Sequence, residues 1–266
     1  AEPSSRPVAC CALLVYDKDA DGSLSAAWMN TLGACYGPYS VAPPGDALGK
    51  AAEGKNIIVI PSRETAAVIK DKAAADSLFA LAAKGAAIII EAPGPEVAKL
   101  IGISPEDKSV SSAPAWLYPG ILPDGIAQTL TGCPARIQFK SHEFHRGGYA
   151  TWMRAGDHPA IVGKAVGCGG VIVTLFDYSR YITKLKQGNI ETGFSSAITG
   201  PATYKLADPE LFSSAIPYAD LFDSFIAGLA SHFAPAASWW PHPGGAKSSL
   251  FLTCSDDGVG RRLNIV

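Results

Sequence analysis

Several features that would assign the chain to a large class of proteins are missing from its sequence. No apolar run reaches the ~18 residues that a membrane-spanning helix needs, so no membrane span is expected. Lysine and arginine number 22 against 24 acidic residues, a net charge of −2. This balance gives no basic excess for nucleic acid or anionic lipid, and we expect neither partner. The six cysteines include no CxxC pair, so a structural zinc site is not expected, while disulfide pairing stays open.

An initiator methionine is also missing. The first residues, AEPSSRP, are short, polar and rich in proline. This pattern is typical of a mature N-terminus left after removal of a signal peptide, and it predicts an extracytoplasmic protein, periplasmic or secreted. A trimmed chain would begin in the same way, so both interpretations stay open.

What the sequence does contain is an alternation of buried strands and helices. Residues are 48% hydrophobic and 17% charged, enough for a sizeable core. Continuous apolar runs predict strands that are covered on both faces, with amphipathic helices between them. This order predicts a three-layer α/β fold with a mainly parallel sheet and right-handed crossovers. The predicted strands cover residues 8–16, 40–43, 56–60 and 86–90, and the helices cover 23–36, 46–52, 65–83 and 96–101.

The pattern changes after this alternation. Prolines, glycines and short alternating runs in residues 104–158 predict loops and antiparallel strands. Residues 160–166 and 170–176 predict a hairpin, and residues 178–187 and 220–233 predict helices. A linker rich in proline and glycine then precedes one more apolar strand. We therefore divide the chain into an α/β domain (1–235), a linker (236–247) and the start of a second domain (248–266).

The element order resembles the class I glutamine amidotransferase-like fold, a flavodoxin-like sheet with an added antiparallel section. That family places a nucleophilic cysteine at a sharp turn after a central strand. The matching run here is AAIIIEAPG, residues 86–94, in which no Cys, Ser or Thr follows the strand. A thiol nucleophile needs an exposing turn and a histidine within reach. The resemblance therefore implies the fold without amidotransferase chemistry.

A second resemblance lies in residues 167–189, GCGGVIVTLFDYSRYITKLKQGN. This segment resembles part of the amidotransferase-like domains that are fused to bacterial polysaccharide deacetylases. The resemblance points to a ligand-binding role for Asp177, Arg180, Gln187 and Asn189. The alternative is structural, because an aspartate that follows a strand can cap the next helix.

The last segment, SLFLTCSDDGVG at residues 249–260, is similar to the first motif of NodB-homology polysaccharide deacetylases. The resemblance implies that Asp256 is the general base and Asp257 a ligand of a divalent, zinc-like metal in a complete deacetylase domain. The family's His-x-x-x-His motif does not occur in this sequence. We therefore expect no cofactor and no activity for this chain alone. The alternative interpretation is that Asp-Asp-Gly forms a turn.

Two further patterns could bind metal. Asp17, Asp19 and Asp21 followed by glycine match the opening of a calcium loop, but a tryptophan stands at the twelfth position. His142 and His145 lie three residues apart, on a stretch that is more typical of a strand than of a helix, so we expect them to face opposite ways.

Together these patterns predict a non-catalytic accessory domain of an exported, metal-dependent polysaccharide deacetylase, a carbohydrate esterase. The deacetylase domain would be its partner in cis, and a polysaccharide ligand and a homo-oligomer both stay open. The alternative is a self-contained extracytoplasmic domain that binds a carbohydrate or another ligand at the carboxyl edge of the sheet.

Overall fold

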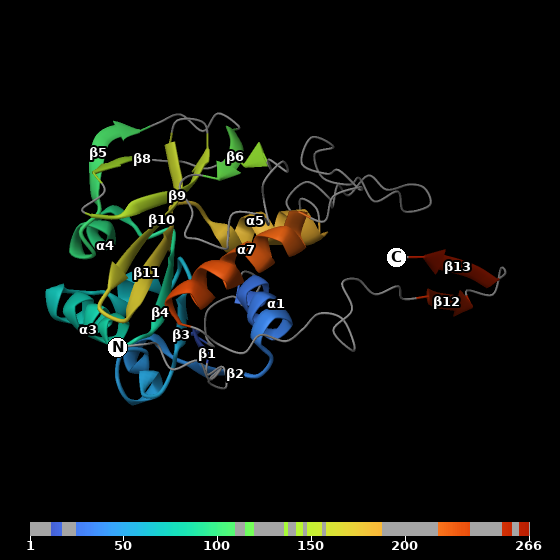
Figure 1. Cartoon of the computed structure of the whole chain (residues 1–266), viewed down its shortest axis with the longest axis horizontal. Coiled ribbons are helices and arrows are strands. Elements are labelled where there is room, and N and C mark those ends of the chain that lie inside the picture. Colours follow the sequence, from blue (N-terminus) through green and yellow to red (C-terminus); the bar gives the residue numbers. More distant parts are fainter. Residues whose placement is uncertain are drawn as a thin grey trace.

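The computed structural model shows one large mixed sheet with helices on both faces (Figure 1). It describes residues 12–17, 25–109, 115–119, 136–137, 142–145, 148–155, 158–187, 218–234, 252–256 and 261–265.

The parallel half of the sheet contains five strands in the order β2-β1-β3-β4-β11. This is the flavodoxin-like order 2-1-3-4-5 when β11 is counted as the fifth strand. The predicted three-layer α/β fold is therefore confirmed. The strands are β1 (Ala12–Val15), β2 (Tyr39–Ala42), β3 (Ile57–Ile60), β4 (Ala87–Glu91) and β11 (Gly169–Thr174).

The sheet continues beyond β11 with antiparallel strands in the order β10-β9-β6-β7. The predicted hairpin is confirmed as β10 (His158–Val166) and β11, and the antiparallel section as β5 to β9. β5 and β8 form a separate two-stranded sheet, as do β12 and β13. The remaining strands are β5 (Ser104–Ser109), β6 (Ala115–Pro119), β7 (Arg136–Ile137), β8 (His142–His145), β9 (Ala150–Ala155), β12 (Leu252–Asp256) and β13 (Arg261–Ile265).

Two apolar layers hold the helices on the sheet, because successive strand residues face opposite sides. Leu14, Val59 and Ile89 pack with α1, α5 and α7 on one face. Leu13 and Ile90 pack with α3 and α4 on the other, as the arrangement in Figure 1 also shows. The helices are α1 (Ser25–Tyr36), α2 (Thr65–Val68), α3 (Lys72–Ala83), α4 (Pro95–Leu100), α5 (Tyr178–Gln187) and α7 (Tyr218–Phe233), with short 3₁₀ turns η1 (Pro44–Asp46) and η2 (Lys50–Ala52).

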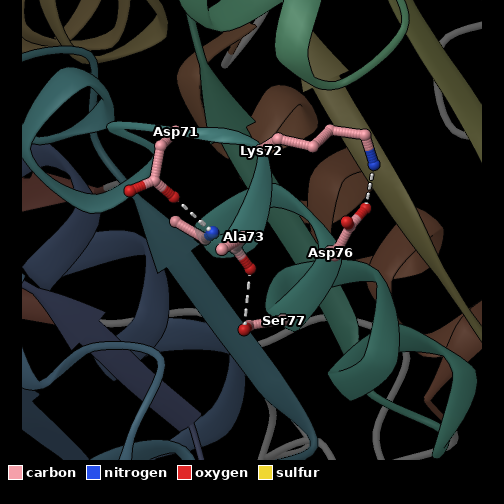
Figure 2. Close-up of polar contacts among 6 residues, drawn as sticks. Asp71, Lys72, Ala73, Asp76 and Ser77 are labelled. Atoms are coloured by element: carbon pink, nitrogen blue, oxygen red, sulfur yellow. Dashed lines mark hydrogen bonds and ion pairs between the residues drawn. The ribbon is translucent and has the colours of Figure 1, made fainter.

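The single helix predicted for residues 65–83 is wrong, because the structure divides it into α2 and α3. Ile69 leaves the helical region with ψ 62°, and Asp71 is extended with φ −156°. The Asp71 side chain then accepts a hydrogen bond from the Ala74 amide at 2.8 Å, which begins α3 with an N-cap (Figure 2). Ion pairing of Lys72 with Asp76 adds little, since both side chains are exposed (Figure 2).

In the antiparallel part of the sheet, an aromatic ring packs directly against a glycine. Trp152 of β9 lies directly over Gly163 of β10, and a Cβ at position 163 would sit 1.8 Å from the indole ring. On its other side Trp152 packs against Phe233 of α7, with ring centroids 5.4 Å apart. The missing side chain at position 163 therefore makes room for the aromatic layer under α7.

Candidate functional site

The bend after β4 is the position at which the family that the sequence resembles carries its nucleophile. Residues 91–94, hereafter the β4 bend, connect the central strand β4 to α4. Ala92 is the only described non-glycine residue with a positive φ, 40°, and its amide donates to the carbonyl of Thr174 at 2.8 Å. The backbone thus makes a sharp, left-handed turn that is fixed to β11, with a methyl group where a reactive side chain would stand.

Glu91, one residue before this turn, is fully buried and meets four hydrogen-bond donors. Its Oε2 atom accepts from the Trp28 indole at 2.7 Å and from the Ser179 hydroxyl at 2.8 Å. The Ser62 amide donates to the same oxygen at 3.2 Å, and the Ser179 amide donates to Oε1 at 2.5 Å. These donors come from α1, from α5 and from the loop after β3, so one carboxylate ties three segments to the end of β4.

Opposing effects set the protonation of this carboxyl group. Burial raises the pKa of Glu91, as does the negative charge of Asp177, while the donors Ser179 and Trp28 lower it. The net result is a pKa of about 7, raised from 4.5. A carboxyl group whose pKa is strongly raised by its surroundings is common at functional sites, and it also occurs in buried structural networks.

Asp223 is a second buried acid, next to the segments that surround Glu91. The Asp223 carboxylate on α7 accepts from the Thr31 hydroxyl at 2.6 Å and from the Tyr178 hydroxyl at 2.7 Å. The ring of Tyr178 packs on Trp28 with centroids 4.5 Å apart. Burial, followed by the charge of Asp223, raises the pKa of Tyr178 well above its usual value. The two acids therefore join α1, α5 and α7 into one polar network inside the apolar layer.

The four residues predicted to bind a ligand have different positions. Asp177 caps α5, because its carboxylate accepts from the Arg180 amide at 2.8 Å. Arg180 is exposed on the first turn of that helix. Gln187 is the last residue of α5, and Asn189 lies outside the described residues. The capping alternative is thus observed for Asp177, and the ligand-binding role of the four residues stays a prediction.

The residues of the predicted metal-binding patterns lie partly outside the described residues. Asp17 follows β1, and its amide donates to the Glu64 carboxylate at 3.4 Å. Asp19 and Asp21 lie outside the described part, as does Asp257. His142 and His145 are the two ends of β8, so the expected strand is confirmed. Asp256 is the last residue of β12, and the metal and general-base roles at 256 and 257 stay predictions.

Across the described side chains, no three His, Cys, Asp or Glu groups lie close enough together to hold a metal ion. Neither Cys35 nor Cys168 is in a disulfide. None of the described helices is long and apolar enough to cross a bilayer.

Comparison with known proteins shows the fold and nothing finer. No family model matches the chain, and no curated protein does. A β-galactosidase from Rahnella sp. R3 is similar in structure, with a TM-score of 0.50, 15% identity, and coverage of 95% of this chain and 35% of that chain. The chain thus spans about a third of the length of that glycosidase.

Two smaller proteins are also similar. A cytoplasmic protein from Salmonella typhimurium LT2 has a TM-score of 0.48 and 10% identity, covering 84% of this chain and 99% of that one. A protein from Thermoplasma acidophilum, assigned as a GMP synthase subunit, has a TM-score of 0.43 and 10% identity, covering 65% and 86%. The strand order itself defines the class: a mixed α/β protein with a flavodoxin-like parallel part and an antiparallel extension.

Replacing Ala92 by glycine is expected to leave stability unchanged or to raise it by up to about 1 kcal/mol, because glycine adopts a positive φ without strain. The control is Ala80→Gly on the exposed face of α3, which should lose about 1 kcal/mol. Urea unfolding followed by circular dichroism measures both. Equal losses for the two variants would contradict a strained bend at Ala92.

Proposed function

We propose that this chain is a non-catalytic module of an exported, metal-dependent polysaccharide deacetylase. The observation that supports the non-catalytic part most directly is the state of the β4 bend. Ala92 offers no nucleophile, and the Glu91 carboxylate has no exposed surface and four donors around it. A general base must reach the proton that it takes from a substrate, and Glu91 has no such access.

The deacetylase part of the proposal rests on the terminal motif. The strand β12 ends at Asp256 and pairs with β13, where Asp256 lies opposite Arg261. In the proposed parent protein Asp256 and Asp257 would supply a base and a metal ligand, and a zinc site needs further ligands from the rest of that domain. A fold of this kind also forms part of a β-galactosidase, which is consistent with a module carried by an enzyme that acts on carbohydrate.

The alternative is a binding module, and the sheet order favours one place for its ligand. The chain passes from β1 to β2 on one side and then to β3 on the other, so the topological switch point lies between β1 and β3. Ligands of open α/β sheets bind at such points. Here Asp17 and Glu64 meet across the switch point.

Two measurements test the proposal. The purified chain should show no glutaminase, amidase or acetyl-esterase turnover, with or without added zinc, and robust turnover by the chain would overturn the non-catalytic assignment.

The natural reading frame that contains the sequence should encode a downstream His-x-x-x-His motif. A frame without that motif would remove the deacetylase assignment and favour the binding alternative. That alternative would then be tested by NMR, as chemical-shift changes at Asp17 and Glu64 when oligosaccharides are added.

A further inference from the structure

The buried carboxyl group of Glu91 has no role in the proposed function, yet its surroundings are unusually specific. We propose that Glu91 is a proton-operated latch: its ionised form ties α1 and the loop after β3 to the end of β4, and uptake of one proton loosens those two ties.

The Glu91 carboxylate has a limited number of acceptor positions. An ionised carboxylate offers about four lone-pair sites and no donor. Three donors meet Oε2, namely the Trp28 indole at 2.7 Å, the Ser62 amide at 3.2 Å and the Ser179 hydroxyl at 2.8 Å. The Ser179 amide meets Oε1 at 2.5 Å. Oε2 is therefore fully engaged while Oε1 accepts one bond, and each bond is strengthened by the charge of the carboxylate.

The groups around Glu91 limit where a proton can bind to it. A protonated carboxyl group must donate, and an indole or amide N–H cannot accept. Among the four donors, only the hydroxyl of Ser179 can reverse its role. We therefore place the proton on Oε2 toward Ser179 Oγ, 2.8 Å away, because this position gives it an acceptor among the four groups.

The proton changes the strength of the hydrogen bonds at Oε2. Oε2 becomes a hydroxyl oxygen and a weaker acceptor, so the bonds from Trp28 and Ser62 lose their charge assistance. Oε1 stays a carbonyl oxygen and keeps the Ser179 amide. Protonation thus acts unequally: α1 and the loop after β3 are loosened, while the start of α5 stays attached. The two loosened segments flank the switch point between β1 and β3.

The charges around Glu91 decide the pH at which this happens. Burial, together with the negative charge of Asp177 at the start of α5, raises the pKa of Glu91 to about 7. Other ionisable groups on the neighbouring segments have other partners or are exposed. The Glu64 carboxylate accepts a hydrogen bond from the Asp17 amide, and the Asp223 carboxylate accepts from the hydroxyls of Thr31 and Tyr178. The Arg63 side chain is exposed. The latch is therefore expected to change state near neutral pH.

Residue-resolved NMR on the full ¹⁵N-labelled chain tests the latch. The Trp28 indole N–H and the Ser62 amide should shift together with one midpoint near 7, and the Ser179 amide should shift less. Histidine ring signals are followed separately, because free imidazole titrates in the same range.

Two variants make the test specific. Glu91→Gln should abolish the shared midpoint. Asp177→Asn keeps a good helix cap and removes only the charge, so the midpoint should fall by about half a pH unit or more. Asp76→Asn on exposed α3 is the matched control and should leave the midpoint unchanged. Signals of Trp28 and Ser62 that do not titrate, or a midpoint that is the same in Asp177→Asn, would overturn the proposal.

Discussion

Replacing Glu91 by alanine is expected to destabilise the fold by about 3 kcal/mol at neutral pH, because the loss of the carboxylate leaves three buried or half-buried N–H donors without this acceptor. Those donors are the indole of Trp28 and the amides of Ser62 and Ser179. Relief of the cost of burying a charge offsets part of the loss. Urea unfolding followed by far-UV circular dichroism measures the difference, and a change below about 1 kcal/mol would contradict the role of Glu91 as a tie between segments.

The contribution of Glu91 to the free energy of unfolding changes with pH in a defined direction. The pKa of Glu91 is about 7 in the fold and 4.5 as a free side chain. Protonation weakens the bonds from Trp28 and Ser62, but it also removes the cost of burying a charge, which is the larger effect. Because the folded value is the higher one, the contribution to stability is fully present below 4.5 and is lost as the pH rises through about 7. The wild-type protein should therefore gain up to about 3 kcal/mol relative to Glu91→Gln between about pH 8 and pH 4.5. Parallel stability curves for the two proteins would show that Glu91 is ionised equally in both states.

Replacing Gly163 by alanine is expected to cost a similar amount, about 3 kcal/mol, through overpacking of the core. The added Cβ would lie 1.8 Å from the ring of Trp152. That ring cannot move away freely, because Phe233 of α7 packs against it at 5.4 Å between centroids. Thermal and urea unfolding measure the loss.

Two further variants separate this clash from a general intolerance of alanine. Gly33 lies in α1 with no heavy atom within 4 Å of an added Cβ, so Gly33→Ala should gain up to about 1 kcal/mol from helix propensity. Trp152→Ala combined with Gly163→Ala should cost less than the sum of the single changes, because the two groups would occupy the same space. Gly163→Ala as stable as Gly33→Ala would show that the aromatic layer adjusts at little cost.

Much of the fold could be predicted from local patterns. The apolar runs that end at Tyr16, Ile60 and Ile90 gave the three central parallel strands, because strands covered on both faces have no polar alternation. The failure at residues 65–83 has a local cause as well. Apolar residues continue at helical spacing through Ile69, and the cap at Asp71 that begins a new helix is visible only as one polar residue in the pattern.

The candidate site was predicted only in part. The sequence indicated that the β4 bend has no nucleophile, and the turn at Ala92 has the sharp geometry expected for that position. The roles of Glu91, Trp28 and Asp223 were not predicted. A signal existed for the first of these, since Glu91 is a lone acid at the end of an apolar run, and a buried acid requires donors. Which donors it meets depends on segments 63 and 88 residues away in the chain.

By itself the sequence determined the order of buried strands and helices, the antiparallel hairpin and the absence of a nucleophile from residues 91–94, because periodicity, turn chemistry and residue identity are local properties. Only the tertiary structure decided that Glu91 meets Trp28, Ser62 and Ser179, and that Trp152 lies over Gly163. These contacts arise when β3, β4 and β11 bring their carboxyl ends to one edge and α7 covers the sheet. No short-range pattern encodes which distant side chains will share that space.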